Sequence, residues 1–213
     1  MACAMDDIVL RGMAKWPDVP DVYGWLSLDR RGNWLIRSTS APPSFEKIGN
    51  RALREFISRN YRADARGCWY FQNGPQRVFV DLDYTPQVYR IASADSAPLA
   101  LETSTGRPVS AVREAWIDET GAALLETEHG IGTVHDRDLD RLLPYFTDAA
   151  GAPLAEDVLD TLMDRLQQGQ WARLWLRIHD ASVNVGPIRS AAVAQRFGFR
   201  ARPEAPAGEE VCR

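Results

Sequence analysis

Alternating hydrophobic and polar positions predict strands along much of this 213-residue chain. The stretch GWLSLDRRGNWLIR, residues 24–37, indicates a hairpin of two strands, Trp25–Leu28 and Trp34–Arg37. Asp29 and Gly32 suit the tight turn between them. A second hairpin is predicted in CWYFQNGPQRVFVDLDYTP, residues 68–86, around an Asn-Gly-Pro turn. The strands of this hairpin are expected at Trp69–Gln72 and Arg77–Leu82, and Val88–Ala92 is expected to complete a meander with them. Further strands are expected at Leu99–Thr103, Val109–Trp116, Trp171–His179 and Val183–Ile188.

Helical spacing of apolar residues predicts four helices, one of them around Leu139, Leu142 and Leu143. In the first, Leu53, Phe56, Ile57 and Tyr61 share one face and Asn50 suits the N-cap. A longer apolar stripe occupies residues 154–166, and Gly169 ends it. A short helix is expected at Ala191–Phe197, and the tail from Pro203 is expected to be disordered.

A weak repeat suggests the domain organisation. SLDRRGNWLIRS and WIDETGAALLET share a layout in which Asp29 and Gly32 correspond to Asp118 and Gly121, and each segment precedes a loop and a helix. We therefore predict an α+β fold of two similar small units, each a curved antiparallel sheet packed with a helix. The polar stretch SADSAP, residues 93–98, places the boundary between residues 1–95 and 96–213. The alternative is a chance likeness of the kind that any α+β protein offers.

Composition limits the class of protein. The formal net charge is -4 and the pI about 5.4, which argues against a dedicated nucleic-acid binder. Cys3, Cys68 and Cys212 are odd in number and form no Cys-x-x-Cys, so neither a disulfide framework nor a zinc ribbon is expected. The sequence shows neither a signal peptide nor an apolar run of membrane-spanning length. We expect a reduced, soluble, cytoplasmic protein that does not bind membranes.

Trp and Arg side chains on the predicted strands form the first candidate site. Aromatic rings and guanidinium groups together can stack a ring and hold an anion. Trp69, Arg77 and Arg90 are the candidate ligand-binding residues on strands, and Asn73 lies at the rigid hairpin tip. The alternatives are ordinary core packing for Trp69 and turn chemistry alone for Asn73.

Two histidines form the second candidate site. His129 and His135 stand six residues apart in ETEHGIGTVHDRDLD, among several carboxylates. Imidazole and carboxylate together can bind zinc, manganese or iron, or transfer protons. The alternative is a solvated loop whose Asp136 caps the following helix. No established catalytic or metal-binding motif is present, so we assign no catalytic residue, metal ligand or cofactor.

The segments DVYGWLSLDRRGNWLIR, FISRNY, GCWYFQNGPQRVFVDLDYTPQVYRI, VREAWIDETGAALLETEHGIG and RFGFRARP extend the interpretation. Together they resemble an uncharacterised family of proteobacterial proteins, over about Met5 to Pro203. The order of elements also loosely resembles a second bacterial family of unknown function, which is α+β with repeated structural motifs. For that second family a signalling role has been suggested. The first resemblance implies no activity, and the second implies the repeated architecture.

These observations favour a non-enzymatic binding or signalling module that recognises a partner protein or a small anionic ligand. The competing hypothesis is a metal- or His-dependent enzyme centred on residues 126–138. A third hypothesis is a structural protein that forms oligomers through an exposed strand edge. The sequence leaves the oligomeric state open.

Overall fold

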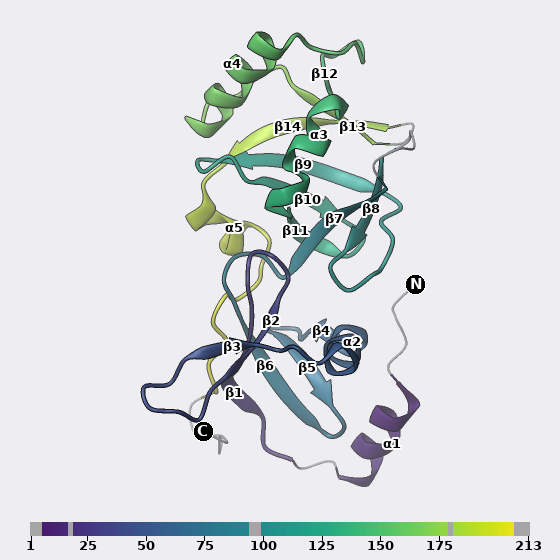
Figure 1. Ribbon diagram of the computed structural model, residues 1–213, viewed down its shortest axis with the longest axis vertical. Coiled ribbons are helices and arrows are strands. Elements are labelled where there is room, and N and C mark those ends of the chain that lie inside the picture. Colours follow the sequence, from purple (N-terminus) through teal and green to yellow (C-terminus); the bar gives the residue numbers. More distant parts are fainter. Residues whose placement is uncertain (1–5, 17–18, 94–98, 179–180, 207–213) are drawn as a thin grey trace. The chain divides into compact units, whose positions relative to one another are not determined.

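The computed structural model describes residues 6–16, 19–93, 99–178 and 181–206 (Figure 1). These residues fall into two compact units. Unit 1 comprises the described residues up to Pro86 together with those from Gly198 onward, and unit 2 is Gln87–Phe197. The boundary expected at residues 93–98 lies almost entirely outside the described residues.

Unit 1 is built on one six-stranded sheet with the strand order β3-β2-β1-β6-β5-β4. The parallel pair β1 and β6 lies at its centre, with Leu28 opposite Leu82, and every other pair is antiparallel. The elements are α1 (Asp7–Lys15), β1 (Val22–Leu28), β2 (Trp34–Arg37), β3 (Phe45–Lys47), α2 (Arg51–Arg59), β4 (Tyr61–Ala63), β5 (Trp69–Asn73) and β6 (Gln76–Leu82).

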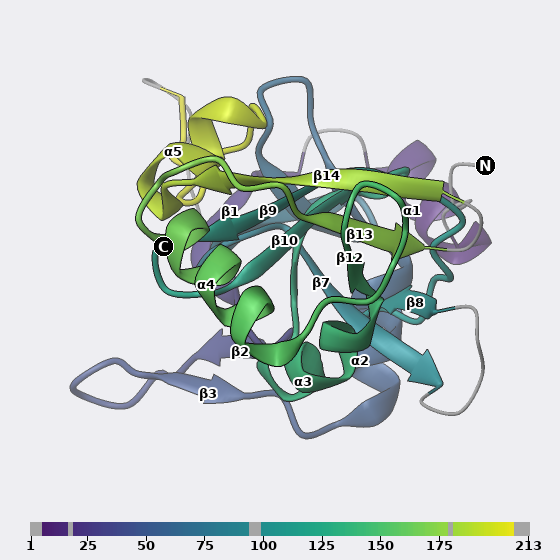
Figure 2. The same cartoon turned by 90° about the horizontal axis from the view of Figure 1, so that it is seen from above.

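Unit 2 is built on an eight-stranded sheet with the order β12-β13-β14-β9-β10-β11-β7-β8. Helix α4 contacts β9 and β14 and covers this part of the sheet (Figure 2). The elements are β7 (Gln87–Ser93), β8 (Ala100–Thr103), β9 (Val112–Asp118), β10 (Ala123–Thr127), β11 (Gly130–Val134), η1 (Asp136–Asp138), α3 (Leu139–Leu142), η2 (Leu143–Tyr145), β12 (Phe146–Thr147), α4 (Glu156–Gln167), β13 (Trp175–Ile178), β14 (Ala181–Ile188) and α5 (Ser190–Arg196).

The two units are similar, as predicted. Read from β11, six strands of unit 2 follow the order β11-β10-β9-β14-β13-β12, which repeats the order in unit 1 strand for strand. The central pair, β9 and β14, is again parallel. Asp29 and Asp118 occupy equivalent turns, and each carboxylate accepts the backbone N–H groups two and four residues further on. The predicted α+β class with two similar units is therefore confirmed.

Local signals placed the first two hairpins and helix α2 correctly. The Asn50 side chain accepts a hydrogen bond from the Leu53 N–H at 3.0 Å, which caps α2 as expected. The apolar face of α2 packs on the sheet, where the rings of Phe56 and Phe71 meet edge to face with centroids 5.4 Å apart. This packing leaves the opposite face of β5 and β6 for other parts of unit 1.

Three expectations about strands and caps were wrong. Val88–Ala92 does not complete a meander with β6, because β1 and β5 already occupy both edges of β6. Instead β7 pairs with β8 and β11. The strand expected from Trp171 begins only at Trp175, and His179 lies outside the described residues. The first turn after β11 is capped by His135 rather than by Asp136.

The chain returns to unit 1 after α5. The Arg200 N–H donates to the Gly67 carbonyl at 3.0 Å, and the Leu82 N–H donates to the Ala201 carbonyl at 2.7 Å. Phe199 is buried between these two hydrogen bonds. The expected disorder from Pro203 concerns a tail of which residues 207–213 lie outside the described part of the chain. Among the described residues, no helix is long and apolar enough to cross a membrane.

Candidate functional site

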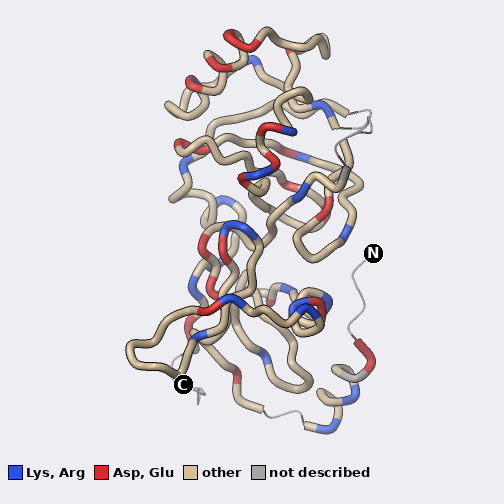
Figure 3. Tube along the Cα trace, viewed as in Figure 1, with Lys and Arg blue, Asp and Glu red and all other residues tan. Residues whose placement is uncertain are grey.

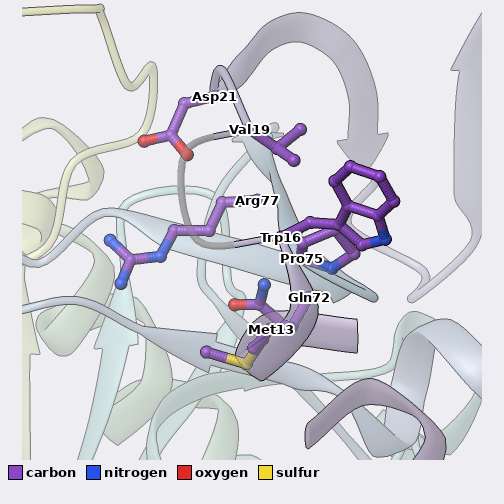
Figure 4. Close-up of a pocket in the computed structure, with 7 residues that line it drawn as sticks. All are labelled: Met13, Trp16, Val19, Asp21, Gln72, Pro75 and Arg77. Atoms are coloured by element: carbon purple, nitrogen blue, oxygen red, sulfur yellow. The ribbon is translucent and has the colours of Figure 1, made fainter. Parts of the chain in front are cut away.

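A pocket of about 360 Å³ lies in unit 1, between the end of α1, the segment leading into β1 and the β5–β6 hairpin. Figure 4 shows its lining side chains. They are Met13, Trp16, Val19, Asp21, Gln72, Pro75 and Arg77. Its volume lies at the lower end of the range for small-molecule sites and equals that of about twelve water molecules in the liquid.

Helix α1 is held against the rest of unit 1 by contacts at its first residues and by contacts further along the helix. At its start, the Asp6 N–H donates to the Asn60 side-chain oxygen, and the Asp6 carboxylate lies 3.3 Å from the Arg59 guanidinium. The hydrogen bond from Arg59 lowers the pKa of Asp6, so this ion pair persists at neutral pH. Further along, Gly12 lies against Gly74 and Pro75, where its missing side chain lets the helix approach the hairpin tip closely.

The segment leading into β1 is attached to the same hairpin. The Gln76 side-chain amide donates to the Pro20 carbonyl at 3.2 Å. Val22 then pairs with Val78, and the two strands continue in parallel after a bulge. These contacts fix Val19 and Asp21 opposite the hairpin and so close one wall of the pocket.

Gln72 supplies a buried hydrogen-bond acceptor in this wall. Its side chain is 1% exposed. The amide Nε2 donates to the Gly74 carbonyl at 2.9 Å and lies 3.4 Å from the Gln76 carbonyl, so the nitrogen is fixed on that side. The Oε1 atom has no hydrogen-bond partner within the described part of the chain. Leaving a buried acceptor unpaired costs about 1–3 kcal/mol. Because Oε1 itself is shielded from solvent, it does not face the open space of the pocket.

Arg77 supplies the positive charge. In the β5–β6 ladder it lies opposite Gln72, so the two side chains share one face of the hairpin. The guanidinium carbon lies 5.2 Å from the centre of the Tyr70 ring, which orients the exposed side chain by a cation–π contact. Figure 4 shows the Arg77 guanidinium and the Trp16 indole on opposite sides of Gln72.

Charges of both signs are interspersed along the described parts of unit 1 and of unit 2 (Figure 3). Two charged residues, Arg77 and Asp21, line the pocket itself. Asp21 already has a partner in the structure, so Arg77 is the charged side chain that we expect to meet a ligand here.

The three candidate residues predicted in the second hairpin, Trp69, Asn73 and Arg77, lie in different places and do not form one site. Arg77 lines the pocket, whereas Asn73 is exposed at the end of β5 and does not line it. Trp69 lies on the opposite face of the sheet, because side chains alternate along a strand. Its ring packs at 4.7 Å from that of Tyr61. Trp69 is thus part of the packing beneath α2.

Sequence reasoning missed α1 and with it Met13 and Trp16. The signal was present, because Val9, Met13 and Trp16 follow the four- and three-residue spacing of a helical face. Gln72 was missed as well. A polar residue at an inward position of an apolar strand was its only sequence signal.

Arg90 in unit 2 makes an ion pair with a buried carboxylate. Its Nε lies 2.6 Å from Asp138, which also accepts from Arg141 at 2.8 Å. Burial works to raise the pKa of Asp138, but the hydrogen bonds from Arg90, from the Ile91 backbone and from Arg141 outweigh it and lower the pKa. Arg90 therefore balances a charge inside unit 2.

The two candidate histidines make separate contacts in unit 2. His129 lies 2.8 Å through Nε2 from the Pro108 carbonyl, which can only accept, so this nitrogen carries the proton. His135 Nδ1 accepts the Arg137 N–H at 3.1 Å and caps η1. Burial, reinforced by the charge of Arg90, lowers the pKa of His135, which is neutral at pH 7.

The structure does not assemble the histidine segment into a metal site. His129 and His135 flank β11, and six residues at about 3.3 Å each separate them by about 20 Å. Within the described ranges, no three His, Cys, Asp or Glu side chains are grouped so as to hold a metal ion.

Two solved structures are similar to the chain. A DUF1285 family protein from Silicibacter pomeroyi DSS-3 is 14% identical, with a TM-score of 0.50 over 88% of this chain and 91% of its own. A DUF1285 family protein from Shewanella baltica OS155 is also 14% identical, with a TM-score of 0.38 over 57% of this chain and 89% of its own. The first likeness shows a shared fold only.

No curated protein matches the chain. A family model does match, over residues 5–204; it is DUF2944, described as "Protein of unknown function (DUF2946)". The resemblances noted in the sequence, to two families of unknown function, are thereby confirmed. The chain belongs to the DUF2944 family of proteins of unknown function.

Proposed function

We propose that this protein is a non-enzymatic binding module that takes a small organic anion into the pocket of unit 1. The observation that carries the proposal is the exposed guanidinium side chain of Arg77, which lines the pocket beside an apolar wall. This guanidinium would hold the anionic group of a bound molecule by charge-assisted hydrogen bonds.

The apolar part of the pocket wall supports a small molecule over an inorganic ion. Met13, Val19, Pro75 and the indole of Trp16 line the cavity. Small-molecule sites are mostly apolar with a few placed polar groups, and this wall has that composition. A signalling role would follow if binding changes how α1 packs on the hairpin, because α1 contributes Met13 to the lining and Trp16 directly follows the helix.

The test is a thermal-shift and calorimetry screen of small organic carboxylates, phosphates and sulfonates against the intact protein. A ligand at one hundred times its Kd stabilises the folded state by about 2.7 kcal/mol, a shift of several degrees in Tm. Arg77→Ala should abolish the shift of every hit while leaving the Tm of the free protein nearly unchanged, because Arg77 is exposed.

Two variants are matched controls. Arg177→Ala removes an equally exposed strand arginine from β13 of unit 2, and it should leave binding intact. Trp69→Ala should lower the Tm, because it empties a partly buried aromatic contact, at a cost of about 3 kcal/mol. A screen without hits, or hits that Arg77→Ala leaves unaltered, would refute the proposal.

We also propose that the protein is cytoplasmic, and that its two units are copies of one repeated segment. Their common strand order and equivalent Asp29 and Asp118 turns support the repeat. The oligomer hypothesis stays a prediction. Light scattering at micromolar concentration tests it, since it requires a mass of two or more chains.

A further inference from the structure

The segment that leads into β13 alternates tryptophan and arginine with buried residues. The buried residues belong to the hydrophobic core of unit 2, and they are Ala172, Leu174, Leu176 and Ile178. The residues between them lie outside this core, and they are Trp171, Arg173, Trp175 and Arg177. Three of these four side chains are exposed and the fourth, Trp175, is partly exposed, so the row is open to a partner.

The neighbouring strand β14 shows that the row lies on one face of the sheet. Trp175 pairs with Asn184, and Gly186 shares the face of Asn184 because side chains alternate along a strand. A Cβ on Gly186 would lie 2.8 Å from the Trp171 ring, so this ring lies over Gly186. Trp171, Trp175 and Arg177 therefore occupy successive positions about 6.6 Å apart, which is two residues of a strand.

The Trp171 ring is fixed in place, but its surface remains available. The Trp171 carbonyl accepts from the Arg165 guanidinium at 3.2 Å, and the ring packs against that of Trp116 with centroids 6.1 Å apart. Trp171 is nevertheless 60% exposed, whereas Trp116 is 8% exposed and lies under the guanidinium of Arg196. A rigid, exposed indole loses little conformational entropy when a flat ring stacks on it.

The two arginines of the row carry free positive charges. Within the described ranges, neither Arg173 nor Arg177 makes an ion pair or a hydrogen bond through its side chain. Glu114 of β9 shares this face, but its carboxylate lies 3.4 Å from the Arg196 guanidinium. The net charge of -4 belongs to the whole chain, and charges more than about 8 Å away are largely screened at physiological ionic strength. The local field at this face therefore attracts an anionic partner.

A single strand of nucleic acid combines the groups that this row fits. Every base offers a flat face to an indole, and every phosphate offers oxygens to a guanidinium. Bases in one strand of a duplex stack about 3.4 Å apart, whereas the two indoles need bases about twice as far apart. On this face β14 presents only Ser182, Asn184 and Gly186, which are too small to cover the rings. The row therefore fits an extended, unstacked strand.

Asn184 favours RNA over DNA. Its Nδ2 donates to the Leu174 carbonyl at 3.2 Å, so its Oδ1 is left as an acceptor on the face that carries the two indoles. A ribose has a 2′-hydroxyl that can donate to this oxygen, and a deoxyribose has none.

From these contacts we propose that this face of β13 and β14 binds single-stranded RNA. Bases stack on the two indoles, and phosphates pair with the two guanidiniums. The site uses no residue of the pocket in unit 1, so it goes beyond the proposed function and does not depend on it.

The test is fluorescence anisotropy of the intact protein at low salt with labelled oligonucleotides about ten nucleotides long. Oligouridylate is the main probe, and oligodeoxyuridylate differs from it only in lacking the 2′-hydroxyls. An RNA duplex of the same length tests stacked bases, and a peptide of alternating glutamate and leucine tests an extended protein segment. We expect oligouridylate to bind at least threefold more tightly than oligodeoxyuridylate and at least tenfold more tightly than the duplex or the peptide.

Substitutions of the tryptophans test the stacking contacts. Trp171→Leu and Trp175→Leu keep apolar bulk and remove the π face, so each should weaken oligouridylate binding about fivefold or more. Trp171→Phe and Trp175→Phe restore a ring and should recover most of the affinity. If Trp175→Leu lowers the Tm, Trp171→Leu at the exposed position decides the test alone.

Substitutions of polar residues test the phosphate and ribose contacts. The slope of log affinity against log salt is about 0.7 per neutralised phosphate, so Arg173→Ala and Arg177→Ala should each lower it by about this amount. Arg113→Ala should leave the slope unchanged; it is the matched control, because Arg113 is an exposed arginine of β9 on the opposite face, which it shares with the core residue Ala115. Asn184→Ala should abolish the preference for oligouridylate over oligodeoxyuridylate.

Each of the other outcomes overturns the inference. Equal affinity for the duplex, or unchanged affinity in Trp171→Leu, would mean attraction by charge alone. Equal affinity for oligodeoxyuridylate would mean that this face does not recognise RNA. Tighter binding of the peptide would make the partner a protein segment, and absence of binding at low salt would leave the row without a nucleic-acid partner. None of these results bears on the anion pocket of unit 1, which has its own screen.

Discussion

Gly12 of α1 lies directly against Gly74 at the tip of the β5–β6 hairpin. A Cβ placed on Gly12 would lie 3.3 Å from the Gly74 Cα and 3.3 Å from the Pro75 Cδ. Real Cβ contacts are seldom this short, so the helix and the hairpin lie closer together than most residues with a side chain would allow. The pocket depends on this approach, because α1 carries Met13 and leads directly to Trp16.

Gly12→Leu should therefore detach α1 from the hairpin. We expect the backbone amides of α1 to exchange hydrogen at least tenfold faster, as measured by mass spectrometry of the intact protein. Gly49→Leu is the matched control, because a Cβ on Gly49 would meet nothing within 4 Å. Equal exchange in the two variants would show that the contact does not hold the helix.

The second prediction compares two Asp-x-x-Gly turns of unit 2, which begin at Asp118 and at Asp148. Asp118 is fully buried, and its carboxylate accepts from the Thr120 N–H, the Thr120 hydroxyl and the Ala122 N–H at 2.7–3.0 Å. Asp148 lies in a more exposed turn, and within the described part of the chain its carboxylate accepts only from the Ala150 and Ala152 N–H groups. Asp118→Ala should destabilise unit 2 by about 3 kcal/mol and Asp148→Ala by about 1 kcal/mol.

Hydrogen exchange in β9 and β10, measured at increasing urea concentration, gives the loss in free energy of unfolding for each variant. The comparison is internally controlled, because both turns have the same Asp-x-x-Gly layout and lie in the same unit. Equal losses would mean that burial of the Asp118 turn adds nothing to its hydrogen bonds.

Residues with local signals were predictable, and contacts between distant segments were not. Asp29 and Gly32 predict a turn, and Asn50 predicts the start of a helix, each from a few neighbouring residues. In the structure Asp29 accepts the Asn33 N–H, Gly32 has a positive φ and Asn50 caps α2. The parallel pairing of Leu28 with Leu82 joins strands 54 residues apart, and no local pattern records it. The pocket likewise depends on contacts between segments that are distant in the sequence. Arg77 was recognisable as a candidate, but the other lining residues include Met13 of α1 and Trp16 just after it, about 60 residues earlier in the chain.

Glu128 makes the stability of unit 2 depend on pH. Its carboxylate accepts from the Ser110 N–H at 2.6 Å, from the Ser110 hydroxyl at 2.7 Å and from the Ala111 N–H at 3.4 Å. Burial works to raise the pKa of Glu128, but these hydrogen bonds outweigh it and lower the pKa from 4.5 to about 2. The folded state therefore favours the ionised carboxylate.

A pKa that is lower in the folded state gives stability that is present above the unfolded pKa and lost as the pH falls. The contribution of Glu128 should be complete above pH 4.5 and disappear as the pH approaches 2. The carboxylate is partly exposed, so we expect about 1 kcal/mol after solvent screening. Glu128→Gln should flatten the stability of unit 2 between pH 5 and pH 2, measured by urea unfolding. An unchanged slope would contradict the assignment.

The segment that follows α5 completes unit 1, and this makes the last prediction. Residues Phe199–Ala201 lie between the loop at Gly67 and the end of β6, bonded through Arg200 to the Gly67 carbonyl and through Ala201 to Leu82. A Cβ on Gly67 would collide with the Gly198 carbonyl, so the contact is as close as a glycine allows. Phe199 is only 7% exposed in this position.

Ending the chain after Phe197 should destabilise unit 1 selectively. Two lost backbone hydrogen bonds at about 1 kcal/mol each and the lost burial of Phe199 at about 2 kcal/mol add up to about 4 kcal/mol. That is a large share of the 5–15 kcal/mol that stabilises a typical domain. Hydrogen exchange should accelerate in β5 and β6 and stay unchanged in β9 and β10. A chain ended after Pro206 keeps the segment and should exchange like the full protein. Retained protection of β6 in the shorter chain would show that unit 1 folds without its C-terminal segment, and that its sheet is stabilised by its own six strands alone.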